Sequence, residues 1–171
     1  NPVIMLDEID KVGASFQGDP ASALLEVLDP EQNSAFRDHY LDVPYDLSKI
    51  LFITTANVPD TIPGPLLNRM EEIHLSGYIT EEKLYIGKRH LVPRLLERHA
   101  LTKDDVRFTD GGLRKLLEGY AREAGVRDFE KVIGNCLRKV ATAKVESKLD
   151  GQVVLNGSKV EDYLGKPRFT D

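Results

Sequence analysis

The stretch Val3-Ile4-Met5-Leu6-Asp7-Glu8 decides how the rest of the chain can be interpreted. Four apolar residues run directly into two carboxylates, which predicts a buried strand that delivers acidic groups to the edge of a sheet. In nucleotide hydrolases, acidic groups at such an edge handle Mg²⁺ and the attacking water. A strand that runs into an ordinary polar turn has the same pattern, so the stretch alone leaves both interpretations open.

The composition is that of a folded, acidic chain. Of its 171 residues, 41% are hydrophobic and 30% are charged, and the formal net charge is −5. Such a chain can bury a core, and its acidity argues against sequence-independent binding of nucleic acid, which needs a basic face. The single cysteine, Cys136, excludes an intrachain disulfide and is consistent with a reducing compartment. No apolar run approaches the roughly 18 residues that a membrane span needs.

A second apolar run, residues 50–55, predicts another strand, which is followed by Asn57. Between the two runs, Asp19 and Pro20 are a favourable helix start, and Asp29 before Pro30 is a favourable stop. A strand, a helix and a strand in this order predict a parallel sheet with a crossover helix. Because the carboxyl ends of parallel strands meet at one edge, the acidic pair and Asn57 should converge there.

The connection through residues 31–46 is polar, and we expect its few apolar side chains to anchor it: Phe36, Tyr40, Leu41 and Val43. After the second strand, a proline-rich loop should lead into a short helix over residues 66–70 that carries Arg69. A short strand is expected at residues 73–75 because apolar and polar residues alternate there.

The second part of the chain predicts a small, mainly helical domain that begins at a plausible hinge, Gly77. Helices are expected over residues 80–99, kinked at Pro93, and over 110–120, 127–148 and 160–164, with strands at 106–109 and 153–155. The longest helix has an apolar stripe at helical spacing, made of Phe129, Val132, Ile133, Cys136, Leu137 and Val140. We therefore expect two domains, residues 1–76 and residues 77–171.

Four features follow one another in a recognisable order: the acidic pair after a strand, Asn57 after a second strand, Arg69 on a short helix, and Arg127 at the start of a long helix. This order resembles the Walker B, sensor 1, arginine-finger and sensor 2 elements of AAA+ ATPases. Two longer strings, GDPASALLEVLDPEQN at residues 18–33 and REAGVR at residues 122–127, resemble the Lon family of ATP-dependent serine proteases. The resemblance covers essentially the whole chain, and it implies part of the parallel AAA+ α/β sheet followed by the small helical lid domain.

The resemblance assigns a role to each feature, with ATP and Mg²⁺ as cofactors. Asp7 would hold Mg²⁺ through a coordinated water, and Glu8 would polarise the water that attacks the γ-phosphate. Asn57 would hydrogen-bond that water or the γ-phosphate. Arg69 would be a finger acting on the nucleotide of a neighbouring subunit, which implies a hexameric ring. Arg127 would reach the γ-phosphate of its own subunit.

Plainer interpretations stand beside these roles. Phe16, between Gly13 and Gly18, could line a central pore and grip unfolded polypeptide, or it could be a local packing anchor. Asp10 could be a third acid of the site, or a cap or turn residue. Arg69 without the family would be taken for a surface arginine. Arg127 could simply open its helix, although a cation there opposes the helix dipole, which favours a functional role.

No G-x-x-x-x-G-K-[ST] string occurs in the chain. The resemblance puts the phosphate-binding loop before residue 1 and a Ser–Lys protease domain after residue 171. We therefore expect a segment of a larger protein that neither hydrolyses ATP nor cleaves protein by itself. As a whole, that protein would unfold and degrade misfolded and regulatory proteins, in the bacterial cytoplasm or alternatively in the mitochondrial matrix.

Two other functions remain open. Asp7-Glu8-Ile9-Asp10 also fits the acidic box of nucleic-acid helicases, but those enzymes usually follow it with a Ser/Thr-Ala-Thr string and basic patches. Here Thr54-Thr55-Ala56 is followed by Asn57, and the chain is acidic, so DNA binding is not indicated. The third possibility is that the helical half is a pure interaction domain.

Overall fold

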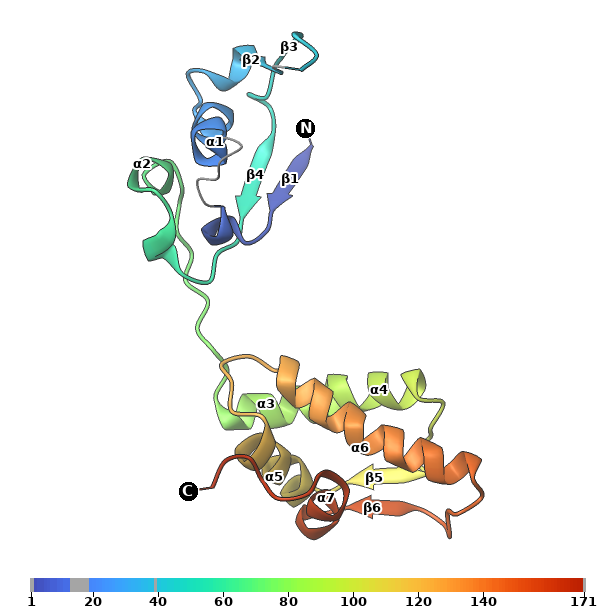
Figure 1. The fold of residues 1–171 in the computed structure, drawn as a ribbon. Coiled ribbons are helices and arrows are strands. Elements are labelled where there is room, and N and C mark those ends of the chain that lie inside the picture. The colour runs from blue at the N-terminus through green and yellow to red at the C-terminus, as the bar shows by residue number, and fades with distance from the viewer. Residues whose placement is uncertain (1, 13–18, 39, 171) are drawn as a thin grey trace. The chain divides into compact units, whose positions relative to one another are not determined.

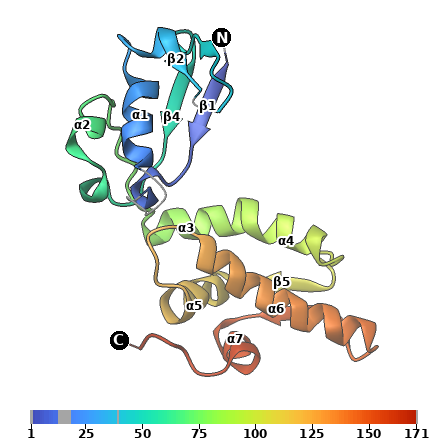
Figure 2. The same cartoon turned by 45° about the horizontal axis from the view of Figure 1, so that its top comes forward.

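The computed structural model describes residues 2–12, 19–38 and 40–170, which form two compact units, Asn1–His74 and Leu75–Asp171. Each unit is described by itself (Figures 1 and 2). The first combines strands with helices and the second is mainly helical, which confirms the expected fold class. Phe16 lies outside the described residues, so its role in a pore stays a prediction.

The first unit is organised around two parallel strands, β1 (Val3–Leu6) and β4 (Leu51–Thr54). The strands pair in register from Val3 opposite Leu51 to Leu6 opposite Thr54, as the two apolar runs predict. Helix α1 (Pro20–Leu28) lies alongside them in both views (Figures 1 and 2). It begins where predicted, because the Asp19 carboxylate accepts the backbone N–H of Ala21 at 3.1 Å.

The prediction that these strands are buried is wrong for one face of the pair. Val3, Met5, Leu51 and Ile53 are 59%, 62%, 60% and 42% exposed. Side chains alternate between faces along a strand, so these in-register residues share one face. The other face meets a small core of Ile9, Ile62 and Leu66, whereas no described element covers this one.

The connection to β4 contains a short hairpin that the sequence patterns do not predict. Strands β2 (Phe36–Arg37) and β3 (Pro44–Tyr45) pair antiparallel. The expected anchors Tyr40, Leu41 and Val43 are exposed, and only Phe36 is half-buried. The reason is local: one carboxylate oxygen of Asp38 accepts the N–H groups of Tyr40 and Leu41, which forms a turn at the exposed tip.

After β4 the chain makes a 3₁₀ turn, Pro59–Thr61, and a short helix, α2 (Gly64–Leu67). The helix ends earlier than predicted, so Arg69 lies in the turn that follows it, with its amide bonded to the Leu66 carbonyl at 3.1 Å. The predicted strand at residues 73–75 is absent: residues 71–79 have no regular structure and are exposed. An extended segment becomes a strand only when another strand pairs with it, and no described strand does so here.

The second unit begins with α3 (Thr80–Ile86) and α4 (Val92–Arg98), joined by a π-helical turn, Gly87–Leu91. The helix predicted to kink at Pro93 is thus continuous, with a wider π turn just before Pro93. Proline lacks the N–H that would bond the preceding turn, and a π turn accommodates this locally. Gly87 allows close packing there, since a Cβ at this position would lie 2.7 Å from Cε1 of Phe129.

Three more helices and two strands complete this unit: β5 (Val106–Phe108), α5 (Asp110–Tyr120), α6 (Arg127–Val145), β6 (Val153–Leu155) and α7 (Gly157–Leu164). The strands pair parallel, and α6 packs against α4, α5 and α7. Helix α7 begins three residues before the predicted start, because the Asn156 side chain caps it by accepting the Lys159 N–H at 2.9 Å.

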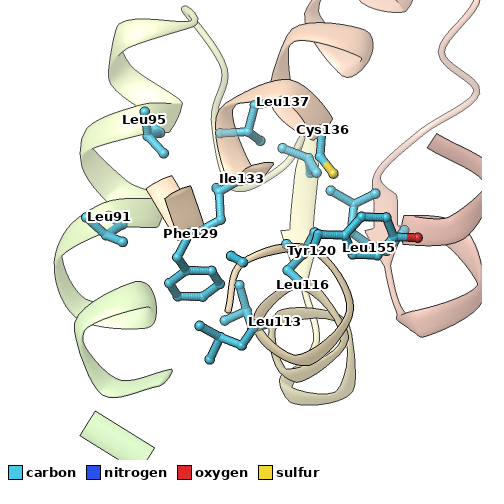
Figure 3. Packing of buried hydrophobic residues seen from close by; sticks show 14 of the residues in the cluster. Leu91, Leu95, Leu113, Leu116, Tyr120, Phe129, Ile133, Cys136, Leu137 and Leu155 are labelled. Atoms are coloured by element: carbon cyan, nitrogen blue, oxygen red, sulfur yellow. The ribbon is translucent and has the colours of Figure 1, made fainter. Parts of the chain in front are cut away.

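The predicted stripe on α6 forms the centre of the core. Its members Phe129, Ile133, Cys136, Leu137 and Val140 are fully buried, and Val132 is partly buried at the edge. Figure 3 shows the stripe between leucines from the α4 side and leucines of α5, with Leu155 beside Tyr120. No helix in the described part of the chain is long and apolar enough to cross a membrane.

Candidate functional site

Thr55 joins the two acidic residues at the carboxyl end of β1. Its hydroxyl donates to Oδ1 of Asp7 and accepts the backbone N–H of Glu8 at 3.0 Å. The position of Thr55 is fixed by the strand pair, because its own N–H bonds the Leu6 carbonyl at 3.0 Å. The sequence patterns do not single out Thr55. Only the strand register points to it, because Thr54 pairs with Leu6 and Thr55 is the next residue.

The backbone of Glu8 has an unusual conformation. Its φ of 55° and ψ of 47° are left-handed, which is uncommon for a residue with a side chain. The conformation is held on both sides: the Glu8 N–H bonds Thr55, and the Glu8 carbonyl accepts the Lys11 N–H at 2.9 Å. The buried side chain of Ile9 anchors the 3₁₀ turn Ile9–Lys11 that follows. Held strain of this kind clusters at functional sites, and here it leaves the side chains of Asp7 and Glu8 exposed.

Asn57 follows β4 as expected and is exposed. The structure brings Asp7 and Glu8 together through Thr55. Among the described residues, the side chain of Asn57 has no hydrogen bond to either acid. Its amide is therefore available to a ligand at this edge.

Arg69 is held by one group at the end of α1 and by one group of α2. Its Nη2 donates to Oδ2 of Asp29 at 3.1 Å, and its Nη1 donates to the Pro65 carbonyl at 2.9 Å. The Glu31 N–H and then Arg69 donate to the Asp29 carboxylate, and both bonds hold the pKa of Asp29 below its usual value. Asp29 is thus a partner that the sequence patterns do not reveal, because it lies 40 residues away.

Arg127 opens α6 in the second unit, and its exposed guanidinium has no ion pair or hydrogen bond to another described residue. It borders a cavity of about 310 Å³ between α4 and α6. Two further arginines line this cavity, Arg98 and Arg138, which the sequence patterns do not single out. An anionic group could therefore meet Arg127 without displacing a side-chain partner.

Asp10 is not a cap. Its side chain is 1% exposed, and neither carboxylate oxygen has a hydrogen bond within the described part of the chain, although Nζ of Lys11 is 3.5 Å from Oδ2. Among the described residues, no hydrogen bond joins the Asp10 side chain to Asp7, Glu8 or Thr55.

The donor set suits a magnesium ion. No group of three or more potential metal-binding side chains occurs in the residues that the structure describes. Mg²⁺ prefers oxygen ligands, keeps several waters and usually takes only one or two protein carboxylates beside substrate phosphates. The exposed carboxylate of Asp7 meets this requirement.

Comparison with known proteins identifies the family. Residues 1–78 match the ATPase family associated with various cellular activities (AAA), and residues 97–153 match the Lon protease AAA+ ATPase lid domain. The whole chain is 60% identical over 171 residues to a Lon protease of Magnetococcus marinus, of which it covers 21%. The chain belongs to the Lon family.

Other Lon proteins are similarly close. Lon protease 2 of Hydrogenovibrio crunogenus is 60% identical over 170 residues, covering 99% of this chain and 19% of the relative. A mitochondrial Lon protease homologue of Ostreococcus lucimarinus is 52% identical over 174 residues, covering 99% of this chain and 18% of the relative. The chain thus spans about a fifth of the length of these Lon relatives. Its match to the AAA family implies nucleotide binding.

Proposed function

We propose that this chain is the part of a Lon-type ATP-dependent protease in which the large domain of the AAA+ motor ends and the small lid domain of the same motor follows. Residues 1–76 would be the C-terminal part of the large AAA+ domain, and residues 77–171 the small lid domain. The observation that carries the proposal is the Thr55 hydroxyl, which ties Asp7 and Glu8 together at the carboxyl end of a parallel strand pair. Acidic groups in that place suit phosphoryl transfer to water.

The acidic cluster supplies the hydrolytic groups. Bound Mg²⁺ would neutralise phosphate charge, with Asp7 holding it through water. The Thr55 hydroxyl keeps one Asp7 oxygen in place and leaves the other free of that bond. Glu8 would accept a proton from the attacking water, and its backbone N–H is tied to the Thr55 hydroxyl that also binds Asp7. Asn57 orients the water or the γ-phosphate.

The two arginines act on phosphate charge from different places. Arg69 is the finger offered to a neighbouring subunit in a homo-oligomer, a hexameric ring, and Arg127 is the sensor that reads the γ-phosphate of its own subunit. A guanidinium stays protonated and presents a fork of donors, which suits developing phosphoryl charge. The ring would draw unfolded protein past Phe16 into a serine-protease chamber, in the bacterial cytoplasm or the mitochondrial matrix.

Mutation of Arg127 tests the proposal in the longer protein. Arg127→Ala should lower ATP turnover at least about tenfold, the size expected when a charged group on the transferring phosphate is lost. Arg107→Ala removes another exposed arginine without a side-chain partner among the described residues and should leave turnover unchanged. Normal turnover in Arg127→Ala would instead support a pure interaction domain. The 171-residue chain alone should not hydrolyse ATP, because it lacks the G-x-x-x-x-G-K-[ST] loop.

A further inference from the structure

Glu123 caps the helix that carries Arg127. Its Oε1 accepts the backbone N–H groups of Asp128 at 2.6 Å and of Phe129 at 2.9 Å, across five and six residues of sequence. These are two of the four N–H groups that the first turn of any α-helix leaves without an internal partner. A residue three positions before the N-cap therefore does what an N-cap side chain normally does.

The cap is needed because the local sequence at the start of α6 is unfavourable. The N-cap residue is Val126, whose side chain has no oxygen to offer, and the first helical residue is the cation Arg127. A positive charge at a helix N-terminus opposes the helix dipole, whereas a carboxylate there is stabilising. The half-buried carboxylate of Glu123 thus offsets the unfavourable interaction between the Arg127 charge and the helix dipole.

Lys83 holds Glu123 in turn. Its side chain is buried within α3, and its ammonium donates to the backbone carbonyl of Glu123. The same loop is fixed one residue further on, where the Tyr78 N–H bonds the Ala124 carbonyl at 3.0 Å. Gly77 packs so closely that a Cβ there would lie 2.9 Å from the Ala124 oxygen. Position 77 therefore requires glycine, because its backbone lies against the loop that precedes Arg127.

We propose that Glu123 is a positioning residue for Arg127. Its carboxylate fixes the first turn of α6, and Lys83 fixes the Glu123 backbone, so the backbone from which the Arg127 side chain extends is held in one place. Glu123 itself touches no reacting group. The inference rests on the role that the proposed function gives to Arg127. It adds that the Glu123 cap returns the start of α6 to the same conformation in each catalytic cycle.

ATP turnover in the longer protein tests the proposal. Glu123→Ala should lower kcat roughly fivefold to tenfold, the size expected from losing one helix cap. Glu123→Gln keeps a carbonyl acceptor for the two N–H groups and should recover most of the loss. Glu97→Ala removes an exposed carboxylate of α4 and is the control, with unchanged kcat expected. Unchanged kcat in Glu123→Ala would overturn the proposal.

A double variant separates positioning from general stability. If Glu123 acts through Arg127, then Glu123→Ala should lower kcat no further when Arg127→Ala is already present. A further fall by the same factor would show independent action and overturn the proposal. Should Glu123→Ala fail to fold, Glu123→Asp replaces it, because the shorter side chain cannot reach both N–H groups. Normal turnover in Arg127→Ala contradicts the proposed function, whereas a loss of turnover in Arg127→Ala with normal turnover in Glu123→Ala contradicts this inference alone.

Amide hydrogen exchange in the 171-residue chain gives a second readout that does not depend on ATP. The N–H groups of Asp128 and Phe129 should exchange faster in Glu123→Ala than in the parent chain or in Glu97→Ala. Equal exchange rates in all three would show that the carboxylate does not hold this turn, which also overturns the proposal.

Discussion

The guanidinium of Arg69 donates to the carboxylate of Asp29, with Nη2 and Oδ2 3.1 Å apart although the two residues are 40 positions apart in the sequence. Asp29 ends α1, and its other oxygen accepts the Glu31 N–H at 3.0 Å, so the carboxylate is itself fixed. Because the Pro65 carbonyl accepts a bond from the other terminal nitrogen, Nη1, the guanidinium has a defined orientation. A residue proposed to act on a neighbouring subunit is therefore oriented within its own unit.

Removing Asp29 should weaken the finger without abolishing it. In the longer protein, we expect Asp29→Ala to lower ATP turnover about threefold to tenfold. Arg69→Ala should lower it more, because only this change removes the positive charge that would act on the phosphate. Asp60→Ala, at an exposed position of the Pro59–Thr61 turn, is the matched control. Normal turnover in Asp29→Ala would mean that this ion pair does not position Arg69.

Two adjacent glycines in α5 should respond oppositely to alanine. A Cβ on Gly112 would lie 2.1 Å from the Leu155 carbonyl oxygen, so Gly112→Ala must push the backbone of β6 and should lower the free energy of unfolding by about 2 kcal/mol or more. A Cβ on Gly111 meets only the Thr109 hydroxyl, at 3.9 Å. Gly111→Ala should be neutral or stabilising by up to about 1 kcal/mol. Urea unfolding of the 171-residue chain measures both, and equal effects would contradict the packing described.

Asp105 should make stability depend on pH in the acid range. The Lys144 ammonium donates to its carboxylate, as do the N–H and hydroxyl of Thr102, and these bonds lower the pKa of Asp105 from 3.8 to about 2. A carboxyl group whose pKa is lower in the folded chain stabilises the fold at a pH above 3.8, its pKa in the unfolded chain. This stabilisation is lost as the pH falls through about 2. Asp105→Asn should therefore lower the melting temperature at neutral pH.

The difference in melting temperature between Asp105→Asn and the parent chain should shrink as the pH falls from about 4 to about 2. Asp104→Asn, at the exposed neighbouring position, is the control and should change little at any pH. A difference for Asp105→Asn that stays constant across this range would contradict the assignment.

Cys136 should be unreactive while the chain is folded. It is fully buried in the α6 stripe, and burial raises the pKa of its thiol to about 12. Since the thiolate is the reactive form, a thiol reagent at about pH 8 should label the native chain very slowly and the urea-unfolded chain quickly. Rapid stoichiometric labelling without denaturant would contradict the packing of the second unit.

The features predicted correctly are those with local signals. The apolar run before Asp7, the Asp19 cap and the α6 stripe each follow from neighbouring residues. The run forms the predicted strand, although one face of it is exposed, and the cap and the stripe are confirmed. The errors have two origins. Alternation at residues 73–75 predicts a strand, but no described strand distant along the chain pairs with it. The apolar residues of the hairpin tip are exposed because Asp38 forms a local turn there.

The candidate site shows the same division. Asp7, Glu8 and Asn57 can be chosen from their places after the two strands. Thr55 cannot, because it binds Asp7 and Glu8 from 48 and 47 positions away in the sequence. Glu123 is visible in the REAGVR string, yet its capping role depends on how the loop folds back onto the helix. Sequence patterns locate reactive side chains more readily than the side chains that hold them.

The central claim is that Asp7 and Glu8 form the hydrolytic part of an ATP site, and Glu8→Gln in the longer protein tests it most directly. This change keeps the shape of the side chain and removes its ability to accept a proton. ATP binding should stay near the parent level while turnover falls at least about a hundredfold. Glu71→Gln, at an exposed position of the same unit, should change neither. Normal turnover in Glu8→Gln would contradict the account.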